Sequence, residues 1–274
     1  MALQTQETMF FINRDMELVD TEPIATGMAA VYAARCPGRE GPNEDAVGLV
    51  SMIPDRGVLI LADGFGGHPA GDQAAEIAVR AVERAVRANE AATDDLRALI
   101  MEGFDRANAE VLALGVGAAT TLAVLEIVQN RVRSYHVGDS GILVVGQRGK
   151  VKLRTMAHSP VGYAVESGLV EEDEAMYHEE RHLVSNMVGS PDMRIDVGPV
   201  VHLALHDTVL MGSDGLFDNM TFDDIVARIR KGPLAAGVSE LARTSRVIMT
   251  APQPEQPSKL DDLSIVAFRR VRAQ

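Results

Sequence analysis

The sequence predicts an α+β protein in which antiparallel sheets pack together and pairs of helices cover their outer faces. Three observations lead to this prediction. Apolar runs of strand length are separated by short turns, which favours hairpins over parallel crossover units. Helical periodicity occurs in two separate pairs of segments, and strands precede, separate and follow these pairs. With 274 residues, of which 46% are hydrophobic, the chain is long enough for one large domain or two small ones.

One apolar run ends in an acidic residue at a glycine-rich turn. Residues 58–62 lead directly into Asp63, and glycines follow at positions 64, 66 and 67. A continuous apolar run of this length predicts a strand buried on both faces. The glycines allow a sharp turn and a close approach of the backbone to a ligand. We therefore expect Asp63 at the end of a rigid strand; the alternative is that it caps the following helix.

Two further acidic residues repeat this arrangement. Asp214 follows an apolar run at 208–212, and Asp261 precedes a strand-like run at 263–268. Partly buried carboxylates at strand ends repel one another unless a cation lies between them. Ligand sets made only of oxygen atoms select hard cations such as Mg²⁺ or Mn²⁺ rather than Zn²⁺. The pattern therefore indicates a divalent metal site.

The other elements are expected from periodicity. Residues 1–26 have no clear period and are expected to form an N-terminal arm or an added strand. Strands are expected at 29–34, 47–52, 58–62, 120–128, 131–137, 142–145, 151–154, 200–205, 208–211 and 264–271, with three hairpins between 120 and 211. Helices are expected at 73–87, from a cap at Thr93 or Asp94 to about 114, at 222–231 behind a cap at Thr221, and at 234–250.

Two segments have a distinctive composition. Alanines recur every three or four residues in the helix expected at 73–87, which predicts close packing on a sheet or a neighbouring helix. Residues 159–195 are acidic with scattered glycines, and we expect an irregular flap or lid with a short helix near 171–180.

Composition excludes several classes of partner. The formal net charge of −13 argues against nucleic acid, because phosphate binding needs a basic surface. No run approaches the length of a membrane span, and the N-terminus lacks the pattern of a signal peptide. Cys36 is the only cysteine, so an intrachain disulfide cannot form. We expect a cytoplasmic protein that is not bound to a membrane.

Six short motifs occur in a fixed order, and each is weak alone. They are Asn43-Glu-Asp45, Asp63-Gly-Phe-Gly-Gly-His68, Gly117-Ala-Ala-Thr-Thr121, Gly138-Asp139-Ser140, Ser213-Asp214-Gly-Leu-Phe-Asp218 and Asp261-Asp-Leu-Ser264. Together, over residues 27–271, they resemble the metal-dependent, type 2C serine/threonine protein phosphatases. The bacterial branch is most similar, because Gly-Gly-His-Pro-Ala-Gly71 follows the first aspartate.

The resemblance implies a four-layer α-β-β-α sandwich of two antiparallel sheets, with a centre of two Mg²⁺ or Mn²⁺ ions at one end. It implies that Asp63 bridges both ions and that the Gly64 carbonyl is a ligand of one of them. By the same resemblance, Asp214 and Asp261 would complete the set of ligands of the other ion. A water activated between the ions would attack phosphorus directly, without a phosphoenzyme.

Further acidic residues match supporting positions of the family. By resemblance, Glu44 and Asp45 hold waters that are bound to the metal ions. We therefore expect Asp45, like Asp63, to be both a catalytic and a metal-binding residue. Asp139 and Asp218 match residues that hold a third, weaker metal in bacterial relatives. The alternative roles of these last two are a turn aspartate and a helix cap.

The substrate-phosphate arginine of the family lies five residues before the first-motif aspartate. Arg39 lies six residues before Asp45 and Arg35 lies ten before it. We favour Arg39 as the catalytic, phosphate-binding arginine, with one residue inserted in the loop, because a guanidinium group matches phosphate geometry.

Other positions depart from the family pattern. Phe65 stands where eukaryotic members have a histidine proposed to protonate the leaving group, and we expect a metal-bound water rather than His68 in that role. Gly141 replaces the usual arginine after Gly-Asp-Ser, and Ala157 replaces the usual aspartate before His158. The losses do not include the predicted metal carboxylates, so the resemblance still implies an active enzyme.

The function expected from the resemblance is hydrolysis of phosphoserine and phosphothreonine in proteins, with the substrates of a serine/threonine kinase as partners. Two alternatives remain open from the residues. One is a pseudophosphatase that binds a phosphoprotein without turnover. The other is a metal hydrolase of small phosphoesters.

Overall fold

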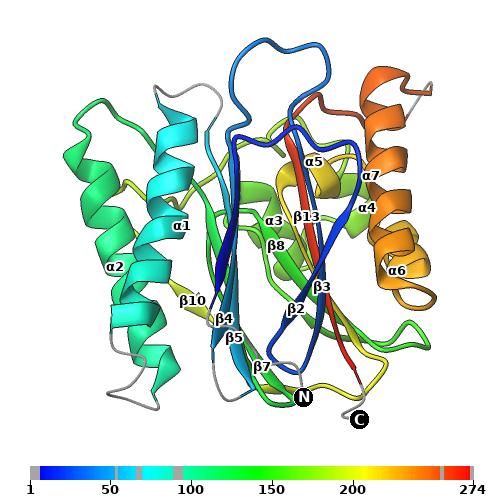
Figure 1. The fold of residues 1–274 in the computed structure, drawn as a ribbon. Coiled ribbons are helices and arrows are strands. Elements are labelled where there is room, and N and C mark those ends of the chain that lie inside the picture. The colour runs from blue at the N-terminus through cyan, green and yellow to red at the C-terminus, as the bar shows by residue number, and fades with distance from the viewer. Residues whose placement is uncertain (1–6, 53–54, 66–69, 89–94, 254–255, 272–274) are drawn as a thin grey trace.

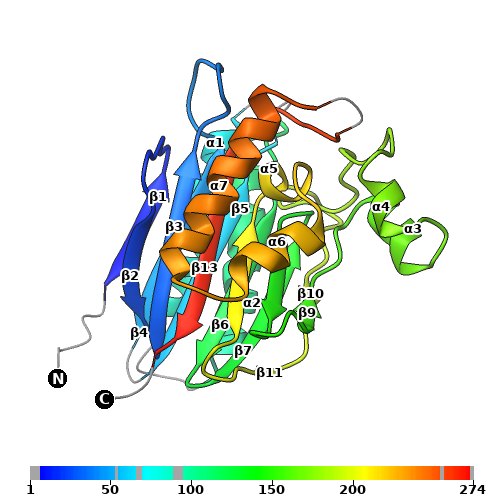
Figure 2. The same cartoon turned by 90° about the vertical axis from the view of Figure 1, so that its right-hand side faces the viewer.

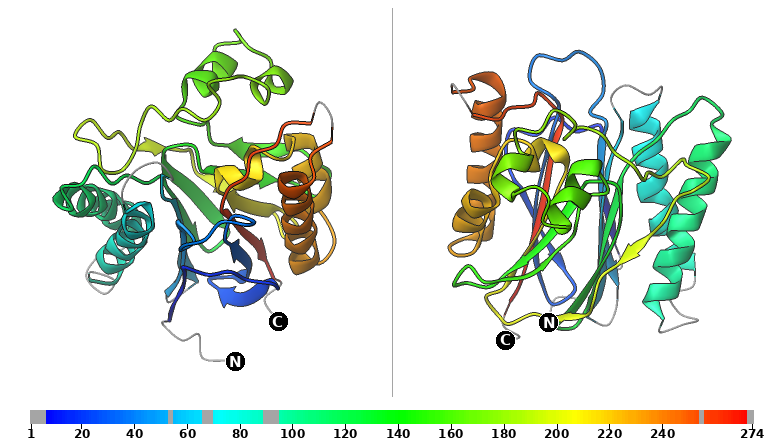
Figure 3. Two further views of the ribbon diagram at one scale, coloured as in Figure 1. Left: turned by 90° about the horizontal axis from the view of Figure 1, so that it is seen from above. Right: turned by 180° about the vertical axis from the view of Figure 1, so that it is seen from behind.

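The computed structural model describes residues 7–52, 55–65, 70–88, 95–253 and 256–271, with the side chains of residues 172 and 173 excepted. Two antiparallel sheets lie face to face, and helices cover the outer face of each (Figure 1). The view from above shows the four layers in cross-section (Figure 3). The predicted α+β sandwich is confirmed.

The first sheet has seven strands among the described residues, in the order β1-β4-β5-β6-β7-β10, with β11 also paired to β7. Its strands are β1 (Thr8–Ile12), β4 (Asp45–Met52), β5 (Arg56–Asp63), β6 (Leu122–Val128), β7 (Arg131–Val137), β10 (Asp196–Val197) and β11 (Val201–His202). The central strands β4 and β5 are almost wholly buried, as their continuous apolar runs predict.

The second sheet has six strands in the described part of the chain, in the order β2-β3-β13-β12-β8-β9. Its strands are β2 (Asp20–Ile24), β3 (Gly27–Ala34), β8 (Gly141–Val145), β9 (Val151–Arg154), β12 (Thr208–Gly212) and β13 (Leu263–Arg270). Strands β3 and β13, far apart in sequence, pair along eight residues each.

Two pairs of helices form the outer layers of the described structure. The pair α1 (Gly71–Ala88) and α2 (Leu96–Ala113) covers the first sheet, and the pair α6 (Phe222–Ile229) and α7 (Leu234–Thr250) covers the second (Figure 1). The described residues also form three short helices, α3 (Pro160–Glu166), α4 (Glu172–Ala175) and α5 (Asp214–Phe217). No helix of the described residues is both long enough and apolar enough to cross a membrane.

The apolar core is divided among the three interfaces between layers. One cluster lies between the two sheets and includes Leu59, Leu125 and Phe268. A second lies between the first sheet and α1 and α2, and a third between the second sheet and α6 and α7. Alternate residues of each strand face different clusters, so every central strand is buried on both faces.

The predicted close packing of the alanine-rich helix is present. Alanines of α1 are buried against the sheet and α2. A Cβ atom at Gly103 of α2 would lie 2.8 Å from the Cα atom of Val82, so the two helices approach there too closely for a side chain. The small residues therefore set the separation of the helices.

Two of the three predicted hairpins form, and the third is wrong. Strands β6 and β7 pair, as do β8 and β9. Strand β11, however, pairs with β7 in the first sheet, whereas β12 pairs with β8 and β13 in the second. The turn between β11 and β12 lacks glycine, and the carboxylate of Asp207 instead accepts the N–H of Ala204 at 2.7 Å. The chain therefore crosses between sheets at this turn.

The ends of several elements can be compared with the predictions. Residues 8–24 contribute one edge strand to each sheet, β1 and β2. The predicted cap Thr221 is confirmed, because its hydroxyl accepts the N–H of Asp224 at 3.2 Å. Thr93 and Asp94 lie outside the described residues, and Asp95 caps α2. The segment 159–195 contains α3 and α4, joined by turns, and projects beside the sandwich (Figure 2).

Candidate metal centre

Asp45 and Asp63 lie side by side at one end of the first sheet. Asp45 is the first residue of β4 and Asp63 is the last of β5. Because the strands are antiparallel, the two residues are direct partners across the sheet. Helix α1 begins only at Gly71, so Asp63 is not the cap of that helix.

The second sheet contributes Asp214 and Asp261 at the same end. Asp214 follows the last residue of β12 by two positions, and Asp261 precedes β13 by two. The N–H of Ser213 donates to the Ser264 carbonyl at 3.1 Å, which holds these two segments together. The N–H of Asp214 donates to Oδ2 of Asp63 at 3.4 Å, so residues from both sheets meet here.

A lysine lies among the acidic residues of the second sheet. The ammonium of Lys259 contacts the carboxylate of Asp214, and it lies 2.9 Å from Asp261 and 3.6 Å from Asp218. Burial alone would lower the pKa of Lys259, but the three carboxylates together raise it. The lysine is therefore charged, and it neutralises part of the cluster.

Asp139 approaches the same cluster from the turn between β7 and β8. The turn requires a positive φ of 99° at Gly138, where a side chain would also contact Thr121. Burial, with the charge of Asp218, raises the pKa of Asp139 to about 6, and Lys259 offsets part of this rise. The predicted third-metal residues thus belong to one electrostatic group with Asp261.

Several buried carboxylate oxygens have no hydrogen-bond partner within the described part of the chain. They are both oxygens of Asp45 and Oδ1 of Asp214. Burial, followed by the charge of Asp262, raises the pKa of Asp45 to about 8, although the nearby Ser264 and Ser213 hydroxyls act to lower it. Burial and the neighbouring Asp45 and Asp214 carboxylates also raise the pKa of Asp63 well above its usual value.

This arrangement fits a divalent cation. Buried carboxylates without hydrogen-bond donors are destabilising, and a cation between them would remove both the repulsion and the missing contacts. All the ligand atoms offered are oxygen, which suits Mg²⁺ or Mn²⁺.

The backbone at Gly64 is closely confined. Its N–H donates to the Glu44 carbonyl at 3.0 Å. A Cβ atom here would lie 2.3 Å from the Gly71 carbonyl oxygen and 2.9 Å from that of Glu44. Only glycine fits, so the turn after β5 brings its backbone against the acidic cluster.

Asp262 fixes the loop that carries Arg39 and Glu44. Its two oxygens accept the N–H groups of Cys36 at 2.6 Å and Glu44 at 2.7 Å, at the two ends of the loop. The guanidinium of Arg39 lies 2.7 Å from the Glu44 carboxylate and 3.7 Å from that of Asp262. Burial raises the pKa of Glu44, and Arg39 offsets part of that rise.

Arg35 is directed elsewhere. Its guanidinium pairs with Asp15 at 3.3 Å and donates to the Gly41 carbonyl at 3.0 Å. Of the two candidate arginines, Arg39 is therefore the one beside the acidic cluster.

The positions that depart from the family pattern are filled differently. The ring of Phe217 lies against Gly141, and a Cβ atom there would be 2.6 Å from the ring, so an arginine at this position would require the ring to move. Phe65 donates its N–H to the Ala119 carbonyl at 3.1 Å. His68 lies outside the described residues.

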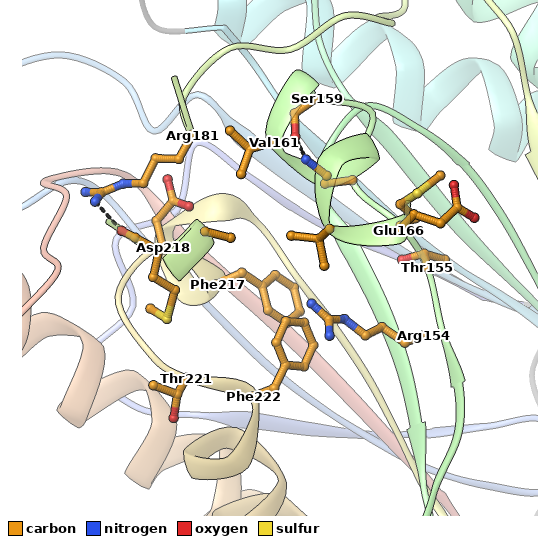
Figure 4. A pocket seen from close by; sticks show the side chains of 16 residues that line it. Arg154, Thr155, Ser159, Val161, Glu166, Arg181, Phe217, Asp218, Thr221 and Phe222 are labelled. Atoms are coloured by element: carbon orange, nitrogen blue, oxygen red, sulfur yellow. Dashed lines mark hydrogen bonds between the residues drawn. The ribbon is translucent and has the colours of Figure 1, made fainter. Parts of the chain in front are cut away.

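A pocket of about 380 Å³ lies between the 159–195 segment and the end of β9. Figure 4 shows Asp218 and Arg181 on one side of it, with the stacked rings of Phe217 and Phe222 opposite Val161. Because Asp218 also contacts Lys259, the pocket adjoins the acidic cluster.

His136, His158 and Asp196 bring potential ligand atoms within 4.8 Å of one another, but their hydrogen bonds disfavour a metal. Nδ1 of His158 receives the Gly138 N–H at 3.1 Å and the Asn186 amide at 2.9 Å. Nε2 must therefore carry the proton, and it faces Asp196 at 3.3 Å. The cluster instead links β7, the turn before α3 and β10.

Sequence reasoning did not single out Lys259 or the role of Asp262. Lys259 stands in a polar loop, where a lysine is ordinary. The one local signal that could have identified it is its position two residues before Asp261, a predicted metal ligand. The bonds of Asp262 to Cys36 and Glu44 depend on tertiary structure and leave no local pattern.

Comparisons with known proteins identify the family of the chain. The model of the protein phosphatase 2C family matches residues 34–242. Protein phosphatase PhpP of Streptococcus pneumoniae serotype 2 is 31% identical over 190 residues, covering 67% of this chain and 76% of that protein. The chain belongs to the protein phosphatase 2C family, in its bacterial serine/threonine phosphatase branch.

Solved structures show the same fold. The serine/threonine phosphatase Stp1 from Staphylococcus aureus has a TM-score of 0.78 at 21% identity, covering 96% of this chain and 100% of that one. The catalytic domain of the phosphatase PstP, in complex with 2 manganese ions, has a TM-score of 0.71 at 23% identity, covering 89% of this chain and 98% of that one.

Proposed function

We propose that this protein hydrolyses phosphoserine and phosphothreonine in proteins and requires Mg²⁺ or Mn²⁺. The observation that carries the proposal is that both carboxylate oxygens of Asp45 and Oδ1 of Asp214, all buried, have no hydrogen-bond partner of normal geometry among the described residues, beside Asp63. Such a set is stable only with a cation or with protons. Its place at the end of two packed sheets agrees with the two-metal centre that the family resemblance implies.

The carboxylates of Asp63, Asp214 and Asp261 and the carbonyl of Gly64 would hold the ions. Glu44 and Asp45 would orient waters. Two bound divalent ions lower the pKa of a water and neutralise charge on phosphoryl oxygens.

Other groups of the chain would position the substrate. Arg39 would donate to the substrate phosphate, and its contacts with Glu44 and Asp262 keep the guanidinium beside the cluster before substrate binds. Asp262 acts through Arg39 and Glu44, since it fixes both ends of their loop. Phe65 has no titratable group, so the proton for the leaving oxygen would come from water.

The similar proteins support the substrate and the metal. The relative PhpP is named a protein phosphatase, and PstP was solved with manganese. We infer that phosphorylated proteins, made by a serine/threonine kinase, are the partners of this chain as well.

The test uses purified protein with and without Mn²⁺. We expect hydrolysis of an aryl phosphate and of a phosphothreonine peptide, and loss of both activities in chelator. No turnover with Mn²⁺ demonstrably bound would indicate a binding module instead. Turnover of the aryl phosphate alone, with phosphopeptides untouched, would indicate a hydrolase of small phosphoesters.

A further inference from the structure

The pocket beside the acidic cluster has an apolar interior that two separate parts of the chain build. Val161, Val165 and Met176 line it from the side of α3 and α4. Phe217 of α5 and Phe222 of α6 line it from the side of the second sheet (Figure 4). A concave surface of this kind favours an apolar occupant, because binding removes apolar area from water.

The aromatic wall of the pocket begins on two glycines. Gly141 of β8 and Gly212 of β12 are direct partners across the second sheet. A Cβ atom at Gly141 would lie 2.6 Å from the ring of Phe217, and one at Gly212 would lie 3.2 Å from it. Phe222 stacks on Phe217 with the ring centroids 5.5 Å apart, and the guanidinium carbon of Arg154 lies 3.2 Å from the Phe222 centroid. The glycine that replaces the usual arginine at 141 therefore leaves room for this wall.

The charged residues of the pocket do not favour a charged occupant. Arg154 and Glu166 are exposed. Arg181 donates to two backbone carbonyls, and Asp218 pairs with Lys259. A charged group would therefore lose water without meeting a fully buried counter-ion among the described residues that line the pocket.

The pocket lies close to the proposed metal centre. Asp218 lines it, and the carboxylate of Asp218 lies 3.6 Å from the ammonium of Lys259. The same ammonium lies 2.9 Å from Asp261, a proposed metal ligand. An extended peptide advances about 3.5 Å per residue. A peptide whose phosphate is held at the centre would therefore bring a side chain from about two or three residues away to the pocket.

We propose that this pocket selects substrates by binding a large apolar side chain, such as leucine, that lies about two or three residues from the phosphorylated serine or threonine. The inference rests on the proposed function, since it concerns the same substrates. Val165 and Phe222 are specificity-determining residues, because they line the pocket from its two sides and do not contact the phosphate. The pocket therefore lowers KM for a protein substrate and leaves the hydrolysis of a small phosphoester unchanged.

The test is a scan with phosphothreonine peptides. Each peptide has serine and glycine around the phosphothreonine, and a single leucine replaces the serine or glycine at one of the four positions before or after it. With Mn²⁺ present, we expect the wild type to prefer leucine at one position, or at two neighbouring positions, by at least about fivefold in kcat/KM, through a lower KM. An aryl phosphate is the substrate that does not reach the pocket.

Two variants change the pocket in opposite ways. Val165→Phe fills it with a side chain of similar helix propensity, and Phe222→Ala removes part of its aromatic wall. Both should reduce the leucine preference to less than about twofold and leave aryl phosphate turnover within about twofold of the wild type. Val247→Phe, at an exposed position of α7, is the matched control and should keep the full preference. Circular dichroism checks that each protein is folded.

A wild type without a leucine preference would overturn the proposal, and so would a preference that Val165→Phe leaves intact. An equal loss of peptide and aryl phosphate turnover in folded Val165→Phe would assign the pocket to the chemical step rather than to recognition, which also overturns it. A wild type that hydrolyses the aryl phosphate and none of the peptides would instead overturn the proposed function itself.

Discussion

At the scale of single residues, the centre depends on carboxylates kept where charge is unfavourable. Asp45 and Asp63 face each other because β4 begins where β5 ends. Burial, followed by the charges of neighbouring carboxylates, holds the pKa of Asp63 well above its usual value. A cation is the simplest group that reverses this effect, and the metal roles of these residues can be tested one at a time.

Asp63→Asn and Asp214→Asn should each lower phosphatase activity by at least about a hundredfold, because the amide keeps the shape but loses the ligand charge. The fold should remain. Activity assays with Mn²⁺, together with circular dichroism, measure both. Asp105→Asn, at an exposed position of α2, is the matched control and should retain full activity. Wild-type rates in Asp63→Asn would contradict the proposed centre.

Arg39→Ala should raise KM for a phosphopeptide by roughly tenfold or more, with a smaller change in kcat, because a charge-assisted contact to ground-state phosphate is lost. Arg35→Ala provides the comparison, since Arg35 pairs with Asp15 away from the cluster. Steady-state kinetics of both variants settle the assignment. An unchanged KM in Arg39→Ala with a large loss of kcat would assign Arg39 a different role.

Protonation of His136 should lower the free energy of unfolding at acidic pH. Burial, and then the neighbouring His158, lower its pKa to about 4, while Asp196 and the Met156 carbonyl act the other way. A histidine whose folded pKa is depressed contributes its full stability above the unfolded pKa of about 6.5 and loses it as pH falls toward 4.

Urea unfolding at pH 7 and pH 4.5 tests this. Between pH 7 and pH 4.5, the free energy of unfolding of the wild type should fall by on the order of 2–3 kcal/mol more than that of His136→Gln, because glutamine does not titrate. Groups common to both proteins cancel in the comparison. Equal losses would show that His136 does not take up the proton.

At the scale of elements, the long strands and helices were predictable and the short ones were not. The runs that became β4 and β5, and the alanine stripe of α1, each contain enough residues for a clear period. Strands β10 and β11 have two residues each, and they exist because β7 offers them an edge. The prediction of the third hairpin was wrong for the same reason. Strands that are distant in sequence determine the places of β11 and β12, since β11 pairs with β7 in the first sheet and β12 pairs with β8 and β13 in the second.

The acidic residues of the candidate centre also differed in how they could be predicted. Asp63 and Asp214 could be found from the sequence, because Asp-Gly turns after apolar runs are a local pattern, whereas Asp45 was expected only from the family resemblance. Lys259 could not be predicted, since the contacts that hold it come from Asn219, which is 40 residues away in the chain. The electrostatic balance of a site depends on such distant groups.

The contact between α1 and α2 should be sensitive to added volume. Gly103→Val would place side-chain atoms where Val82 already lies, and we expect a loss of about 2 kcal/mol or more in the free energy of unfolding. Ala109→Val, on the exposed face of α2, controls for the lower helix propensity of valine. Urea denaturation compares the two, and equal losses would indicate that the helices separate freely.

At the scale of the whole molecule, the centre joins two sheets that otherwise contact each other through apolar side chains. Asp45 and Asp63 belong to the first sheet, and Asp214 and Asp261 flank strands of the second. An ion bound by these residues would therefore stabilise the folded chain as a unit, because the unfolded chain does not bring these ligands together.

Mn²⁺ should accordingly raise Tm. Free Mn²⁺ at one hundred times its Kd adds about 2.7 kcal/mol to the free energy of unfolding when it binds one site. Calorimetry or dye-based melting measures the shift, and chelator should reverse it. Asp63→Asn should remove most of the shift, and a full shift in that variant would place the ion elsewhere.

The meeting of both sheets at Asp63 and Asp214 has a mechanical consequence. Any shear of one sheet past the other would change the spacing between these carboxylates, because they are attached to different sheets, and the close-packed apolar side chains between the sheets would transmit the strain. Substitutions deep in the sandwich, such as at Leu125, should thus alter turnover through misalignment while the protein still melts cooperatively.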